Sequence, residues 1–152
     1  MADTPQVIEL ETNGKGSFII GEAIGAAGAT PTPGHLLEYL AAGTVQEHST
    51  ADGISQKMIC LPNLPVASDI DAAYVAGETV RFGYAQPGQA ANMILAISQT
   101  ATRITELVSN GDGTLKINAD TTGNADVSIV GWPISPVTTT TTGTARIKVR
   151  IA

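Results

Sequence analysis

The amino-acid sequence predicts a mainly β fold: a small β-barrel or β-sandwich with one short connecting helix and an extended N-terminal arm. Sixteen glycines and eight prolines in 152 residues interrupt the chain at short intervals, which leaves little room for long helices. Asn-Gly and Asp-Gly steps are strong hairpin signals because both tolerate positive φ, so we expect a hairpin joining 104–109 to 114–118. We expect a single β-rich domain over residues 17–152, preceded by an arm over residues 1–16.

The arm, "MADTPQVIELETNGKG", has three apolar residues, Val7, Ile8 and Leu10, between a proline and two glycines. Such a segment is either an extended arm that orders on a partner or an ordinary edge strand of the same domain. It lacks the basic and apolar regions of a signal peptide, so we expect none.

Ten later segments have the alternating or continuous apolar pattern of strands. In one of them Val80, Phe82 and Tyr84 take alternate positions, which predicts an inward-facing aromatic side and an outward-facing Arg81. The ten segments are 17–24, 35–40, 43–48, 56–61, 79–84, 91–97, 104–109, 114–118, 126–132 and 145–151.

One short helix is expected over residues 69–76. Ser68 can act as its N-cap, and Asp69 and Asp71 favour the positive end of the helix dipole. Gly77 can end the element. A helix of about two turns would be a connector and not part of the core.

The C-terminal strand, 145–151, alternates three cations, Arg146, Lys148 and Arg150, with apolar residues. We expect the apolar side chains to face inward and the cations to face outward. The cations either keep the strand soluble as edge protection, or they meet acidic groups on a neighbouring subunit or a partner. The threonine run 138–142 is expected to be a polar connection before this strand.

Trp132, the single tryptophan, has two readings. It is a core residue with its indole N–H satisfied, or it is an interface anchor, since tryptophan is enriched in binding hot spots. Together with Val7, Ile8, Leu10, Arg146, Lys148 and Arg150 it forms our set of candidate interface residues.

Composition excludes several classes of partner. A net charge of −6 argues against a nucleic-acid-binding protein, which needs a basic face. There is no apolar run of transmembrane length, so we expect no membrane partner. The single cysteine, Cys60, lies in an apolar stretch and is expected to be a buried thiol in a protein made in a reducing cytosol.

No motif indicates catalysis, a cofactor or a metal, and we expect no enzyme activity. The glycine-rich segment 21–34 lacks both phosphate-loop patterns. His35 and His48 have no zinc-ligand spacing around them. His48 and Ser49 are adjacent on a strand and point to opposite faces, so they cannot act as base and nucleophile.

The order of several short motifs resembles the head-decoration, or capsid cement, proteins of tailed bacteriophages. The likeness covers residues 33–152, and the arm at residues 1–16 lies outside it. In order, the motifs are "PGHLLEYLAAGTVQEHSTADG", "QKMICLPN", "DIDAAYVAGETVRF", "ANMILAI", "LVSNGDGTL", "IVGWPISPV" and a terminal "ARIKVRI".

This resemblance implies a structural virion protein, made in the host bacterial cytoplasm and bound to the outer capsid surface. There it would stabilise contacts between subunits of the major capsid protein, as a homo-oligomer, often a homotrimer. A capsid-binding role for the arm is a separate hypothesis. The alternative function is a non-enzymatic carbohydrate- or receptor-binding β module of a phage fibre or head fibre.

Overall fold

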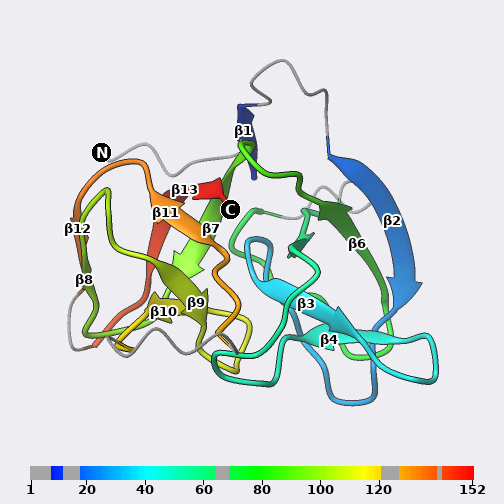
Figure 1. Ribbon diagram of the computed structural model, residues 1–152. Helices are drawn as coiled ribbons and strands as arrows, with labels where there is room; N and C mark the ends of the chain where they lie inside the picture. The colour runs from blue at the N-terminus through cyan, green and yellow to red at the C-terminus, as the bar shows by residue number, and fades with distance from the viewer. Residues whose placement is uncertain (1–7, 12–17, 64–68, 121–126, 140–141) are drawn as a thin grey trace.

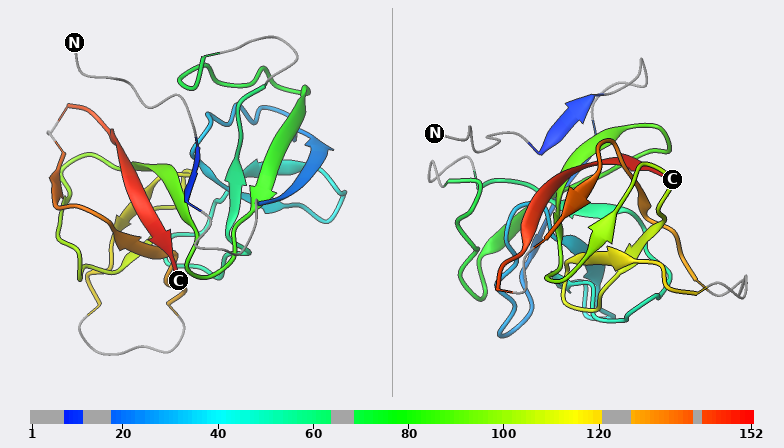
Figure 2. Two further views of the ribbon diagram at one scale, coloured as in Figure 1. Left: turned by 90° about the horizontal axis from the view of Figure 1, so that it is seen from above. Right: turned by 90° about the vertical axis from the view of Figure 1, so that its left-hand side faces the viewer.

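The protein is described by a computed structural model over residues 8–11, 18–63, 69–120, 127–139 and 142–152. These residues form thirteen strands and no helix, which confirms the mainly β prediction. No helix that could cross a membrane occurs among them. The strands gather into two units that lie side by side, one in each half of the molecule (Figure 1; Figure 2, left).

The first unit, which we call the ring, is built on a six-stranded sheet. β7 pairs with β13 in addition to its other neighbours, so five strands close on themselves and β1 adds to one edge of β7. The sheet order is β1 (Glu9–Glu11), β7 (Ala90–Leu95), β10 (Leu115–Ile117), β9 (Leu107–Ser109), β11 (Gly131–Pro133) and β13 (Ala145–Ile151).

The second unit, which we call the barrel, is a five-stranded sheet. A bridge between Gly25 and Val45 joins its first strand to its last and closes it. Its order is β2 (Ile19–Ile24), β6 (Thr79–Tyr84), β5 (Met58–Cys60), β3 (Leu36–Tyr39) and β4 (Val45–Glu47). The remaining strands, β8 (Thr100–Ala101) and β12 (Val137–Thr138), form a two-stranded ribbon.

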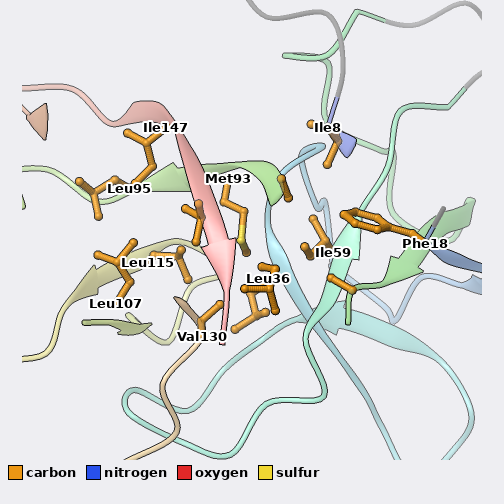
Figure 3. Close-up of a cluster of buried hydrophobic side chains, with 14 of the residues drawn as sticks. Ile8, Phe18, Leu36, Ile59, Met93, Leu95, Leu107, Leu115, Val130 and Ile147 are labelled. Atoms are coloured by element: carbon orange, nitrogen blue, oxygen red, sulfur yellow. The ribbon is translucent and has the colours of Figure 1, made fainter. Parts of the chain in front are cut away.

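Two apolar cores fill these units. The larger core occupies the ring and its junction with the barrel (Figure 3). The smaller core lies inside the barrel, around Phe82. Leu36 belongs to the larger core and the adjacent Leu37 to the smaller one. Because successive side chains of a strand point to opposite faces, β3 forms a wall that the two cores share.

The predicted helix at 69–76 is wrong: this segment is a series of turns. A helix would pair the Tyr74 N–H with the Ile70 carbonyl. Instead the Tyr74 N–H donates to the Pro31 carbonyl at 2.9 Å, and the Ile70 carbonyl accepts from the Arg146 guanidinium at 3.0 Å. Tertiary partners have therefore taken both groups of the helical bond.

The predicted hairpin is confirmed. β9 and β10 pair antiparallel, with Ser109 opposite Leu115, and the turn between them contains Gly111 and Gly113 at φ of 89° and 82°. Both φ values lie in the left-handed region, where glycine has no steric penalty. The strands at 79–84 and 145–151 match β6 and β13 residue for residue.

Other boundaries differ from the prediction. The segment 126–132 contributes only its last two residues to β11, and Thr138, expected in a connection, pairs with Thr100 in the small ribbon. The arm includes β1, whose residue Glu9 pairs with Ala91 of β7. Of the two alternatives for this segment, the edge strand is therefore the one that residues 9–11 form.

Candidate interface

Three of the predicted interface residues lie together on one face of the ladder between β11 and β13. Trp132 pairs directly with Arg150, and the Ile134 N–H donates to the Lys148 carbonyl at 2.8 Å. Side chains of opposite residues in a ladder point to the same side. We call this surface the basic face; its members are Trp132, Ile134, Lys148 and Arg150.

The basic face is open to solvent to different degrees. Lys148 is exposed, and the other three members are half-buried. Arg150 is anchored, since its Nη1 donates to the Gly88 carbonyl at 3.0 Å. On the opposite side of β13, Ile147, Val149 and Ile151 are buried in the core, which confirms the predicted alternation. Trp132 is thus neither a fully buried core residue nor a fully exposed anchor.

Arg146 does not belong to this open surface, although the alternation predicts that it faces outward with Lys148. Its side chain is only 10 % exposed, and it reaches from the ring to the loops of the barrel. The guanidinium donates to the carbonyls of Pro33 at 2.7 Å and Ile70 at 3.0 Å, and pairs with the Asp71 carboxylate at 2.8 Å. Its acidic partner is in the same chain, so the prediction that Arg146 faces outward, to solvent or to another subunit, is wrong for this residue.

The candidate residues of the N-terminal segment are placed differently again. Ile8 is 1 % exposed and packs in the larger core, so it is not an open contact residue in this fold (Figure 3). Leu10 lies in β1. Val7 lies outside the described residues.

A second surface, which the sequence did not indicate, lies on the barrel. β2 presents Ile20, Glu22 and Ile24 on its outer side, because the alternate residues Gly21 and Ala23 face the barrel interior opposite Phe82 and Val80. Ile24 is 59 % exposed and Ile20 is 44 % exposed. We call these three residues the β2 face.

His48 takes part in a closed hydrogen-bond network that joins the barrel to the ring. Its Nε2 lies 2.9 Å from the Ile54 carbonyl, which can only accept, so in the neutral ring Nε2 holds the proton. Nδ1 then accepts from the Ser109 hydroxyl at 2.8 Å, and this hydroxyl accepts from the Gly111 N–H at 3.2 Å. Both nitrogens of the buried ring therefore have partners.

Ser49, the neighbour of His48, turns the other way. Its hydroxyl donates to the Glu38 carboxylate at 2.6 Å, as does its backbone N–H at 3.1 Å. These bonds, with that of Gln46, lower the pKa of Glu38, outweighing a burial effect that acts in the opposite direction. The expectation that His48 and Ser49 do not meet is confirmed. Sequence reasoning did not find Ser109, which is 61 residues away from His48.

His35 lines a cavity of about 320 Å³ at the junction of the two units, together with Asp71 and Arg146. Burial lowers the pKa of His35, against the opposing effect of Glu47 and Asp112. Within the described part of the chain, no three histidine, cysteine or carboxylate side chains are arranged to hold a metal ion. Cys60 is a buried free thiol, as expected, and burial raises its pKa well above the usual value.

No protein-family model matches the chain. A search of curated proteins likewise finds no match.

Proposed function

We propose that this protein is a head-decoration protein of a tailed bacteriophage, which binds the outer capsid surface and stabilises contacts between major capsid protein subunits. The observation that supports this proposal most is the ordered series of motifs over residues 33–152. In the fold these motifs contain strands of both units, namely β3, β4, β5, β6, β7, the β9–β10 hairpin, β11 and β13. Motifs of this kind stabilise the fold, as expected for a protein that acts by presenting a contact surface.

The proposed mode of action is linkage. A protein that binds the assembled shell, and not the free subunits, shifts the assembly equilibrium toward the shell by about 2.7 kcal/mol per site at a hundredfold excess over the dissociation constant. Occupancy of many sites multiplies this effect. The protein then needs no catalytic group, cofactor or metal, and after synthesis in the host cytoplasm it would reside on the virion.

A carbohydrate-binding module is the second candidate. Tyr39 is 42 % exposed at one end of the barrel, where its ring packs edge-on against Phe82 at a centroid distance of 5.7 Å. An exposed aromatic ring of this kind can stack on a sugar face. The basic face supplies one further half-buried aromatic residue, Trp132. A glycan-array screen comparing wild type with Tyr39→Ala would test this candidate.

The decoration proposal is tested by mixing the purified protein with undecorated, expanded heads of its phage and with unexpanded proheads. We expect saturable co-sedimentation with expanded heads and a higher melting temperature of those heads. Absence of binding to both forms would contradict the proposal. Serum albumin added at equal concentration is the control for trapping in the pellet.

A further inference from the structure

Formal charge is divided unequally between the two units. Residues 18–85, which build the barrel, contain seven carboxylates and two cations, a net charge of −5. Residues 86–152, which supply all strands of the ring except β1, contain four carboxylates and five cations, a net charge of +1. With Glu9 and Glu11 of β1 the ring strands come to −1, so the barrel carries most of the negative charge, while five of the cations lie in residues 86–152. A cationic face of one copy is therefore favoured beside the barrel of another, whereas two barrels repel.

The β2 face and the basic face lie on strands in different halves of the molecule. β2 is the outermost strand of the barrel, and β11 and β13 belong to the ring in the other half (Figure 1). In the view from above, β2 lies at one extreme, and β13 runs through the other half to its C-terminal end near the middle (Figure 2, left). A copy can thus use both faces at once, each toward a different neighbour.

The two faces also match in chemistry. The β2 face offers two exposed isoleucines flanking the carboxylate of Glu22. The basic face offers the apolar surface of Trp132 and Ile134 beside the cations of Lys148 and Arg150. An apolar centre with opposite charges at its rim is the usual composition of a protein–protein contact, and the charges mainly select the partner and its orientation.

We propose that the basic face of one copy binds the β2 face of a second copy, which makes a head-to-tail contact. Because the two faces differ, this contact is heterologous and generates a ring if the rotation closes, or a filament if it does not. This inference goes beyond the proposed function, because a contact between two copies of the chain needs no capsid.

The test uses the purified full chain without heads and measures mass by light scattering after size exclusion. We expect the wild type to form an assembly of three or more copies. Lys148→Glu should weaken it at least tenfold, because the new carboxylate would face the acidic barrel of the neighbour. Glu22→Lys alone should also weaken it, and the double variant Lys148→Glu, Glu22→Lys should restore it.

Arg103→Glu is the matched control, because it makes the same change of net charge at an exposed turn residue outside both faces. It should leave the assembly unchanged, and circular dichroism of every variant checks the fold. A wild-type monomer, or a double variant that remains dissociated, would overturn the head-to-tail contact. A wild-type monomer that still co-sediments with expanded heads would overturn the head-to-tail contact but would not contradict the proposed decoration function.

Discussion

At the scale of the residue, Arg146 and Lys148 show how two cations with the same sequence pattern acquire different roles. Both alternate with buried apolar residues in β13. Arg146 pairs with Ile94 of β7, beneath the barrel loop that contains Gly34, and its guanidinium is enclosed by backbone carbonyls. Lys148, two residues further along the strand, is exposed.

We expect Arg146→Met to lower the free energy of unfolding by about 2–4 kcal/mol, because buried carbonyls of Pro33 and Ile70 lose a charged donor. Lys148→Met, the matched control in the same strand, should change it by less than about 0.5 kcal/mol. Urea unfolding of both variants measures the difference. Equal, small effects would show that the guanidinium contacts contribute nothing to stability.

His35 predicts a pH dependence of stability. Burial lowers the pKa of His35 in the folded state, so the unfolded chain binds the proton more readily. The contribution of the neutral His35 ring to the free energy of unfolding is therefore fully present above about pH 6.5, and it is lost as the pH falls below that value. In the wild type the Thr32 N–H donates to His35 Nδ1 at 3.3 Å. The variant His35→Asn retains an acceptor for this N–H.

Unfolding free energies at about pH 7.5 and 5.5, above the ordinary carboxylate range, isolate this effect. We expect the wild type to lose stability between these values and His35→Asn to lose less. An identical loss in both proteins would assign the pH dependence to other groups.

At the scale of the element, local sequence signals predicted the structure correctly where nearby backbone groups supply the hydrogen-bond partners. The β9–β10 hairpin follows from two glycine-containing steps, because its turn needs positive φ whatever packs around it. The predicted helix at 69–76 does not form, because Arg146 and Pro31 provide hydrogen-bond partners for the backbone groups that a helix would pair with each other. A two-turn helix gains little free energy of its own and yields to such partners.

Two glycines with similar backbone angles separate turn strain from packing. Gly43→Ala, at φ 80° with no atom near the new Cβ, should cost about 1–2 kcal/mol from conformation alone. Gly113→Ala, at φ 82°, should cost more, because its Cβ would lie 3.0 Å from Glu47 Cβ and from His35 Cγ. Thermal unfolding compares the two. Equal costs would mean that the hairpin adjusts freely against the barrel.

At the scale of the whole molecule, the ring and the barrel share strand β3 and are joined by hydrogen bonds. β3 contributes Leu36 to one core and Leu37 to the other. The Lys57 ammonium donates to the Ile129 carbonyl, and His48 bonds to Ser109. A single domain over residues 17–152 stays a prediction, and these shared contacts favour it.

If the two units unfold as one, Leu36→Ala and Leu37→Ala should each cost about 2–5 kcal/mol and shift the same transition. Fluorescence of Trp132 reports on the ring, and far-ultraviolet circular dichroism reports on all strands. We expect both probes to give coincident urea curves for the wild type and both variants. Separate curves would show that the ring and the barrel are independent domains.

The sequence by itself determined the mainly β class, most strand positions, the hairpin and the inward side of β13. These features depend on the alternation of side chains and on turn residues, which act within a few positions of the chain. The sequence also identified three of the four basic-face residues as interface candidates, but it did not show that they lie together. The register of β11 and β13 was needed to place Trp132 beside Arg150, which is 18 positions further along the chain.

Only the tertiary structure decided which exposed surfaces exist. In β2, Gly21 faces inward, since a Cβ there would lie 2.5 Å from the Phe82 ring, and the exposed Ile20 and Ile24 lie on the other side. The Phe82 ring occupies this part of the barrel, so a small residue must face it at position 21. Likewise, only the barrel loops over β7 distinguish Arg146 from Lys148. Burial depends on which distant segment occupies the space, and a pattern within one strand does not contain that information.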